Sequence, residues 1–247
     1  MKFLLLFISC YIFSQEVHVR YLHVRSPIAT VTEDLYIKEG RVISIQDSIV
    51  NFNTNGMSSV VAIAKKESKS PRNYYISALE DSGNGKDYFF NGVLKNQDYF
   101  IHDKVPHIVW NIEETSSKKI LGYDCVKATT TFRGSKMVAY FTKDLPYSAG
   151  PFKYYGLPGL ILDLREVNTN YNIWKAQKVE LVVDSKIKMQ PNFKYDKITF
   201  KDFVTAKDGA FISSIKSINQ GVPGSNVTFE RNVGLEKLYE WETTNKQ

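Results

Sequence analysis

Histidine is the first side chain to examine for catalytic or metal-binding chemistry, and this sequence of 247 residues contains four histidines. His18 and His23 are five positions apart, as are His102 and His107, and Pro106 interrupts the second pair. Because side chains alternate across a strand, this odd separation places the members of each pair on opposite faces. Neither pair has a cysteine nearby in sequence to complete a metal site. We therefore expect solvated or packed histidines, no bound metal and no cofactor.

Cys125 is the candidate nucleophile, because a cysteine thiolate can attack an electrophilic carbon when a base lies beside it. Asp124 precedes it, and a neighbouring carboxylate raises the pKa of a thiol, so we expect a small packed residue here. The sequence contains no phosphate-binding glycine loop, no dinucleotide fingerprint, no nucleophile elbow and no zinc-protease motif. Scattered carboxylates cannot be paired from sequence, so glycosidase chemistry stays open.

The amino terminus has the pattern of an export signal. A basic start at Met1 and Lys2 precedes a mostly apolar run over residues 3–13, which predicts a secretory signal peptide over residues 1–14. The run is too short to cross a bilayer, and no later stretch is long and apolar enough, so we expect no transmembrane span. Cys10 follows a segment that vaguely resembles a lipobox, which leaves lipidation open, although simple cleavage is favoured. The predicted location is the periplasm or the cell surface.

The charge balance is basic, with 32 Lys+Arg against 26 Asp+Glu and a formal net charge of +6. Residues 65–72 carry a run of basic side chains that could meet phosphates or an anionic membrane. Isolated charge runs are usually solvated loops, and export makes nucleic acid an improbable partner. We therefore expect a solvated loop and no nucleic-acid partner.

Short β-rich segments dominate the chain, and aromatic residues make up 13% of it. Their regular spacing predicts an antiparallel meander. The clearest hairpin spans residues 123–142 with its turn at Arg133, Gly134 and Ser135, and others join 35–37 to 42–45 and 160–164 to 171–174. Further strands are expected at residues 17–24, 59–63, 74–77, 88–90, 99–101 and 107–110.

One segment has helical spacing instead. Large apolar side chains recur near the 3.6-residue period between residues 199 and 219, with Thr199 as the expected cap: Phe200, Phe203, Val204, Phe211, Ile215 and Ile218. The chain after Gly224 is polar. We expect one β-rich domain over residues 15–224 and a polar tail over residues 225–247.

The most distinctive stretch follows the long hairpin, at residues 150–162. Within it, Leu157, Pro158, Gly159 and Leu160 suit a type II turn, because Pro158 presets the second position and Gly159 tolerates a positive φ. An apolar strand then leaves the turn. By its residues alone, this segment is expected to be a structural corner that begins a core strand.

Residues 156–161 spell the motif that names the GLPGLI family of secreted Bacteroidetes proteins, and residues 110–164 resemble that family closely. The residues of the resemblance include Gly156, Leu157, Pro158, Gly159, Leu160 and Ile161, with Gly122 and Cys125 in the strand pair before them. The resemblance implies an envelope protein without an established enzyme activity. The Gly122–Cys125 region is also similar to hairpins of LolA-like lipoprotein carriers, which implies a mainly β fold with a curved antiparallel sheet or open half-barrel, and a C-terminal helix packed on it.

Three functions follow from this interpretation. The first is a non-catalytic periplasmic carrier of an apolar or lipid-like ligand, with four aromatic residues as candidates for its lining: Trp110, Tyr123, Tyr140 and Tyr155. The second is an envelope protein that docks a partner protein beside an outer-membrane transporter or secretion system, and the third is an unrecognised hydrolase. Of these three functions, we favour the ligand carrier. A sheet interior filled by side chains would contradict that function.

Overall fold

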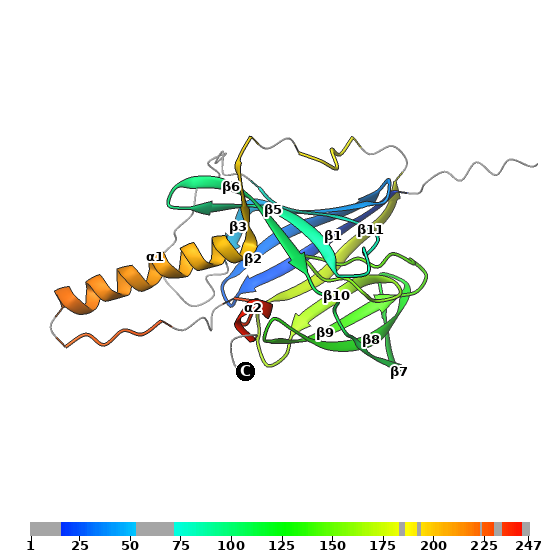
Figure 1. Cartoon of the computed structure of the whole chain (residues 1–247). Helices are drawn as coiled ribbons and strands as arrows, with labels where there is room; N and C mark the ends of the chain where they lie inside the picture. The colour runs from blue at the N-terminus through cyan, green and yellow to red at the C-terminus, as the bar shows by residue number, and fades with distance from the viewer. Residues whose placement is uncertain are drawn as a thin grey trace, which may run out of the picture.

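The computed structural model describes residues 16–52, 72–182, 186–191, 194–222, 224–229 and 234–243, which form a single sheet and two helices (Figure 1). The strands are β1 Glu16–Ser26, β2 Ala29–Lys38, β3 Arg41–Phe52, β4 Asn73–Ala78, β5 Lys86–Leu94, β6 Gln97–Val105, β7 Asn111–Ile120, β8 Tyr123–Phe132, β9 Ser135–Thr142, β10 Leu160–Glu166, β11 Ile173–Val182 and β12 Asp196–Thr199. The helices are α1 Phe200–Gly221 and α2 Glu240–Thr243.

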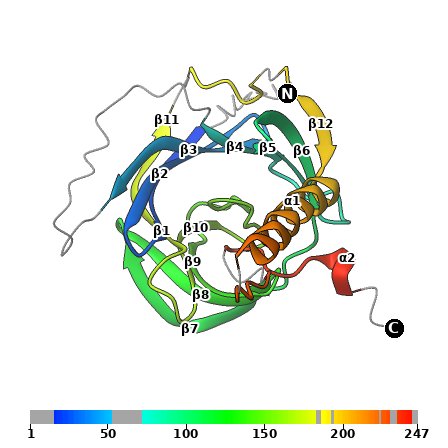
Figure 2. The same ribbon diagram turned by 90° about the vertical axis from the view of Figure 1, so that its left-hand side faces the viewer.

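All 12 strands belong to one open sheet, in the order β12-β6-β5-β4-β3-β2-β1-β11-β10-β9-β8-β7. Neighbouring strands are antiparallel except β12, which runs parallel to β6. Figure 2 shows that the sheet curves strongly around an interior. Its two edge strands are β12 and β7, which stand at opposite ends of the hydrogen-bonding order. A mainly β fold with an open sheet and a helix near the carboxyl terminus is therefore confirmed.

The predicted hairpins are present because their turn residues accept left-handed backbone. Arg133 and Gly134 both have positive φ, at 44° and 85°, and join β8 to β9. Glu39 and Gly40 do the same between β2 and β3, at 50° and 68°. Two consecutive positive φ values match the twist of the flanking strands.

One predicted strand differs from the structure, and another lies outside the described residues. Residues 107–110 are not a strand, and the next strand, β7, begins only at Asn111. Pro106 explains the delay in part, because proline has no N–H to donate to a sheet. The other predicted strand, at residues 59–63, lies outside the described residues, as do the predicted signal peptide, Cys10 and residues 65–71 of the basic loop.

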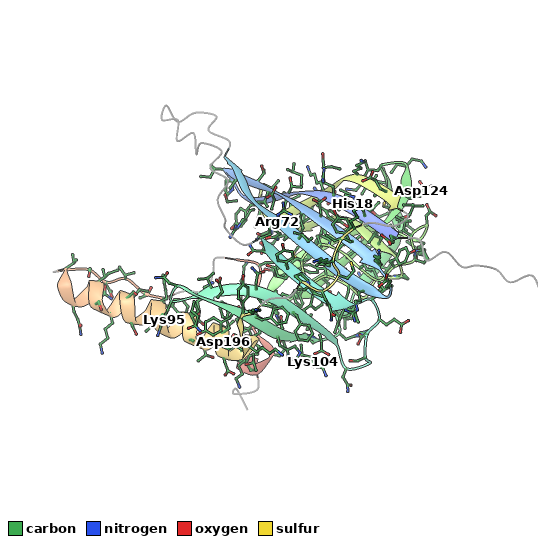
Figure 3. All side chains as sticks on the ribbon, turned by 90° about the horizontal axis from the view of Figure 1, so that it is seen from above. His18, Arg72, Lys95, Lys104, Asp124 and Asp196 are labelled. Carbon is green, nitrogen blue, oxygen red and sulfur yellow. The ribbon has the colours of Figure 1, made fainter. Side chains whose placement is uncertain are left out.

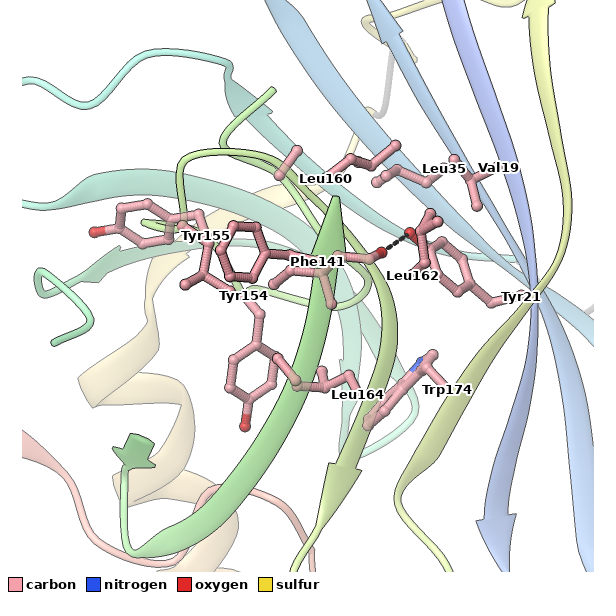
Figure 4. Packing of buried hydrophobic residues seen from close by; sticks show 14 of the residues in the cluster. Val19, Tyr21, Leu35, Phe141, Tyr154, Tyr155, Leu160, Leu162, Leu164 and Trp174 are labelled. Atoms are coloured by element: carbon pink, nitrogen blue, oxygen red, sulfur yellow. Dashed lines mark hydrogen bonds between the residues drawn. The ribbon is translucent and has the colours of Figure 1, made fainter. Parts of the chain in front are cut away.

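The connection between β9 and β10, residues 143–159, lies inside the curve of the sheet (Figure 2). Its apolar side chains are buried in the same cluster as the inward residues of the strands, and they include Leu145, Ala149, Tyr154, Tyr155 and Leu157. Figure 4 shows part of this cluster, with Tyr154 and Tyr155 near Phe141. The Tyr21 hydroxyl in the same cluster donates to the Ile161 carbonyl at 2.6 Å. This part of the sheet interior is therefore filled by the chain itself.

Helix α1 begins as expected, with the Thr199 hydroxyl accepting from the Asp202 N–H at 3.1 Å. Only part of its apolar stripe meets the sheet. Phe200, Phe203 and Val204 are buried, whereas the Phe211 side chain is 55% exposed, because the helix projects beyond the sheet (Figures 1 and 3). The prediction of a helix packed on the sheet holds for its first turns alone. None of the described helices is long and apolar enough to cross a membrane.

Candidate functional site

A hollow of about 560 Å³ lies where the inner face of the sheet meets the carboxyl-terminal segment. We call it the aromatic pocket. Strands β1, β3, β4 and β11 contribute to it, together with the 143–159 connection and residues 234–236. Its lining residues are His23, Arg25, Ser26, Pro27, Gln46, Asn73, Tyr75, Phe152, Tyr171, Asn172, Trp174, Gly234, Leu235 and Glu236.

The floor of the aromatic pocket is a pair of stacked rings. His23 and Trp174 lie with ring centroids 3.9 Å apart and planes inclined by 13°. Both residues are buried, and β1 and β11 are hydrogen-bonded neighbours in which His23 pairs directly with Trp174. Their contact is thus a cross-strand aromatic pair, which stabilises the sheet while it forms the base of the hollow.

A buried carboxylate fixes this floor from below. Glu33 is fully buried, and its side chain accepts four hydrogen bonds: from Ser44 Oγ at 2.5 Å, Gln46 Nε2 at 2.8 Å, the Phe152 N–H at 2.7 Å and Trp174 Nε1 at 2.8 Å. Four donors satisfy the acceptor capacity of a carboxylate without a cation. Glu33 therefore ties β2, β3, β11 and the inner connection to one point, which sets the orientation of the Trp174 ring.

His23 is electrostatically distinct from the other histidines. Burial, and then the nearby Arg25, lower the pKa of His23 to about 3, so its imidazole is neutral at physiological pH. Neither ring nitrogen has a hydrogen-bond partner among the described residues. A neutral imidazole carries one donor and one acceptor. Buried polar atoms without partners are uncommon in folded proteins and often mark functional sites.

The other three histidines pair with carboxylates. His18 lies on the opposite face of β1, between Asp34 at 2.7 Å and Glu180 at 2.9 Å, and hydrogen bonds to these two groups raise the pKa of His18 despite partial burial. His102 contacts Asp87 at 2.7 Å, and His107 contacts Asp81 at 2.6 Å. Across the described ranges, no group of three or more His, Cys, Asp or Glu side chains is arranged to hold a metal ion.

Half-buried aromatic rings form part of the pocket wall: Tyr75, Phe152 and Tyr171. Tyr75 meets Phe152 edge to face with centroids 4.9 Å apart. The Phe152 and Trp174 ring centroids are 6.3 Å apart, with planes inclined by 30°. Phe152 adopts a positive φ of 57°, a strained conformation for an aromatic residue, and its N–H bond to Glu33 holds it there. The pocket thus presents aromatic surface beside amide and guanidinium groups, and it suits a ligand that has both apolar faces and many hydrogen-bonding groups.

A buried ion cluster lies behind Glu236 in the pocket wall. Arg133 and Lys153, each with a side chain 1% exposed, both contact Asp103 at 2.7 Å. Glu236 contacts Arg133 at 2.5 Å and Lys153 at 2.7 Å, and Glu240 contacts Arg133 at 3.0 Å. Burial alone would raise the pKa of Asp103, but Lys153 and Arg133 more than offset it and hold that pKa below its ordinary value.

The four aromatic residues predicted to line a ligand site do not meet in one pocket. Trp110 donates from Nε1 to the Tyr155 carbonyl at 2.8 Å, and Tyr155 is buried in the core. Tyr140 lies under the Lys118 ammonium, 3.7 Å from the ring centroid. Trp110 lines a different hollow from Tyr123, and neither hollow is the aromatic pocket. Trp110 and Tyr155 therefore contact each other, and none of the four residues lines the aromatic pocket.

The motif at residues 156–161 has a packing role. Leu157, Leu160 and Ile161 are buried. The expected type II turn is wrong, because Gly159 lacks a positive φ. Gly159 is required for another reason: a Cβ there would lie 2.0 Å from the Thr142 carbonyl oxygen. The positive φ belongs to Gly156, at 97°.

Gly122 and Cys125 also have structural surroundings. Gly122, with φ at 89°, follows Leu121 in the tight turn between β7 and β8. Cys125 is completely buried, and burial raises the pKa of its thiol to about 11, whereas Asp124 adds only a minor increase. The prediction of a packed cysteine is confirmed, and a thiol with this pKa is a poor nucleophile at neutral pH.

Comparison with known proteins identifies the family of this chain. A family model described as the N-terminal domain of an N-glycanase peptide matches residues 36–202, which is more than half of the chain. The chain belongs to this family. No curated protein matches it.

Two solved structures of PNGF-II, in the C2 and P21 space groups, resemble the fold, with TM-scores of 0.53 and 0.52 and sequence identities of 13% and 14%. Each comparison covers 78% of this chain but only 32% and 33% of the solved chains. The chain therefore spans about a third of the length of those proteins. At these identities the likeness establishes the fold alone.

The family assignment corrects the resemblance inferred from the sequence. The matching model is that of the N-glycanase domain, and no comparison supports membership of the GLPGLI family or similarity to LolA-like carriers. Within the motif at residues 156–161, Leu157, Leu160 and Ile161 are buried in the core, so these residues have a packing role. The predicted function of a lipid carrier, with its alternative of an envelope docking protein, is contradicted by the same findings. The 143–159 connection also fills the part of the sheet interior that a carrier would need for an apolar chain.

Sequence reasoning missed the residues that build the aromatic pocket. One signal for Glu33 was present: it alternates with Val31 and Leu35, so it had to share their buried face. A charged residue on an apolar face needs hydrogen-bond partners, and this pointed to a polar site. No comparable signal existed for His23 and Trp174, because their contact joins segments far apart in the sequence.

Proposed function

We propose that this chain is a non-catalytic glycan-recognition domain that binds carbohydrate in the aromatic pocket. The observation that carries this proposal is the combination of aromatic walls with polar groups around one hollow. A sugar ring has an apolar C–H face, which packs on an aromatic ring, and a rim of hydroxyl groups, which require donors and acceptors. Tyr75, Phe152 and Tyr171 offer the rings, and Asn73 and Arg25 offer the polar groups.

Family membership supports the choice of ligand. The name of the family identifies its larger member proteins as N-glycanases, so an N-linked glycan is the carbohydrate that we propose for this pocket. The hollow of about 560 Å³ falls within the usual range of ligand sites, about 300–1,000 Å³. The match includes all of β4 and β11, which carry Tyr75 and Trp174.

The proposal of a non-catalytic role is supported by the state of the candidate reactive groups. The Cys125 thiol is sealed in the core with its pKa raised to about 11. Glu33, the buried carboxylate under the pocket, is committed to four hydrogen bonds. We also propose that the chain is exported, on the basis of the amino-terminal pattern of residues 1–14.

Calorimetric titration with an N-linked oligosaccharide released from a glycoprotein tests the proposal. We expect saturable binding, and we expect Tyr171→Ala to weaken it about tenfold, since losing one aromatic contact costs roughly 1–1.5 kcal/mol. Tyr123→Ala is the matched control, because Tyr123 is a half-buried tyrosine that lines a different hollow. Absence of binding by the unaltered chain, or equal losses in the two variants, would refute the proposal.

A further inference from the structure

One wall of the aromatic pocket belongs to a segment that is not part of the sheet. Gly234, Leu235 and Glu236 line the pocket, and they begin a segment over residues 234–243 that we call the C-terminal strap. The N–H groups of Lys237 and Leu238 both donate to the Arg133 carbonyl, at 2.8 Å and 3.0 Å. The strap is therefore attached at the β8–β9 turn rather than along a strand.

Ion pairs to buried cations hold the strap in place. Arg133 and Lys153 supply two positive charges, and Asp103 supplies one negative charge beside them. Glu236 contacts both cations and supplies the second negative charge, which balances them. Glu240, whose side chain is partly exposed, adds a third carboxylate beside Arg133. If the strap departs, one buried positive charge loses its compensation, and an uncompensated buried charge is costly. The strap therefore has a well-defined docked state, which we call the latched state.

Packing at the attachment point fits a segment that docks as a unit. A Cβ at Gly134 would lie 3.2 Å from the Lys237 Cβ and 3.3 Å from the Leu238 Cβ, so the glycine lets the strap rest directly on the turn. Tyr239 and Trp241 lie edge to face on Phe200 at the start of α1, with centroids 5.4 Å and 5.9 Å apart. Two backbone hydrogen bonds to Arg133 and these ring contacts therefore hold the strap near one cluster.

His23 supplies the second, independent observation. It is 95% buried in a hollow that the strap helps to enclose, and neither of its ring nitrogens has a partner among the described residues. The latched state thus leaves a donor and an acceptor unsatisfied on the pocket floor. A ligand with hydroxyl or amide groups would satisfy both, provided that it can reach them.

We infer that the C-terminal strap is a gate: the pairs that Glu236 and Glu240 make with Arg133 and Lys153 keep the strap in the wall of the aromatic pocket and restrict access to His23 on its floor. Their release admits the ligand to the floor. This inference concerns the regulation of the proposed glycan site, and it rests on the proposed function only for the identity of the ligand. The latched state is the resting state, because it buries both cations with their charges compensated.

The rate at which diethyl pyrocarbonate modifies His23 measures the opening of the gate in the full chain. The reagent attacks neutral imidazole, and the low pKa of His23 keeps its ring neutral at pH 7, so access limits its rate. His107, whose side chain is 66% exposed, is the reference within each sample, and peptide mass spectrometry separates the two sites. We expect the double variant Glu236→Gln with Glu240→Gln to raise the His23 rate at least about tenfold, because it removes the three charged contacts with Arg133 and Lys153. Glu114→Gln, which breaks the exposed pair with Lys143, is the control and should leave the rate unchanged.

A disulfide staple tests the opposite direction and retains both latch carboxylates. Gly134→Cys with Leu238→Cys joins Cβ positions 3.3 Å apart, close to the roughly 3.5–4.5 Å that a disulfide spans. We expect the oxidised staple to slow modification of His23 and reduction to restore it. The inference is overturned if the double variant at Glu236 and Glu240, which we call the latch variant, leaves the His23 modification rate unchanged. It is also overturned if the oxidised staple leaves that rate unchanged. If the latch variant does not fold, the result for the staple decides.

The two proposals fail separately in this experiment. The modification rates report the gate with no glycan present. Oligosaccharide added to the latch variant should protect His23; absence of protection, with the rate still raised, would count against the proposed glycan ligand and leave the gate in place.

Discussion

Replacing Glu33 by alanine should strongly destabilise the protein, because it removes the acceptor for four buried donors. The Ser44 hydroxyl and the Gln46 amide can rotate towards other partners. The Phe152 N–H is fixed by the backbone and the Trp174 Nε1–H by the buried indole ring, so both become unsatisfied. Each orphaned donor costs about 1–3 kcal/mol, which gives a loss of roughly 2–6 kcal/mol in the free energy of unfolding.

A second substitution at the same position separates hydrogen bonding from loss of volume. Glu33→Gln keeps the size of the side chain but turns one oxygen into an NH₂ group. One carboxylate oxygen accepts from Ser44 and Phe152 and the other from Gln46 and Trp174. Whichever way the amide turns, one fixed donor faces the NH₂ group. We therefore expect an intermediate loss of about 1–3 kcal/mol for this variant.

Urea unfolding monitored by tryptophan fluorescence measures these free energies, with the slope checked for constancy. Glu113→Ala is the control, because Glu113 makes a partly exposed pair with Lys127, and such pairs contribute about 0–1 kcal/mol. Trp174→Phe combined with Glu33→Ala completes a double-mutant cycle, and the coupling should be about 1–3 kcal/mol since the orphaned indole donor is removed. Losses at Glu33 no larger than the control, at an unchanged slope, would show that the four bonds do not hold the pocket floor.

Two further predictions concern the inner connection and the pocket histidine. Gly159→Ala should destabilise the chain severely or prevent folding, since its Cβ would lie 2.0 Å from the Thr142 carbonyl oxygen. Gly209→Ala should instead stabilise the chain by about 0.5–1 kcal/mol, because the new Cβ has nothing within 4 Å in an exposed helix. Thermal unfolding of both variants checks this, and similar melting temperatures would contradict it. His23 has a lowered folded-state pKa, so the stability that depends on its neutral ring is complete above about pH 6.5 and falls by about 1.4 kcal/mol per pH unit below it, down to a pKa of about 3. His23→Phe should abolish that part of the pH dependence in urea titrations between pH 7.5 and pH 5, and an identical profile for the variant would refute the assignment.

The sequence predicted the local elements well, because their causes are local. Alternating apolar residues and left-handed turn positions such as Arg133 and Gly134 identify the hairpins. Thr199 caps α1 through the N–H of Asp202, three residues later. The buried state of Cys125 also follows from its strand position. The amino-terminal signal, the absence of a nucleic-acid partner and the domain limits stay predictions.

Long-range contacts decided what the sequence could not. The 143–159 connection folds into the curve of the sheet, so Tyr155, one of the residues expected to line a groove, is buried in the core. Glu33 receives its hydrogen bond from Trp174 across 141 positions of the chain, and His23 stacks on the same ring. No periodicity specifies such pairs, because they depend on the order of strands in the sheet. The sequence by itself determined a β-rich chain with one capped helix. Only the tertiary structure decided which polar and aromatic residues meet in a pocket, because β11 becomes the neighbour of β1 and β2 only when the sheet assembles.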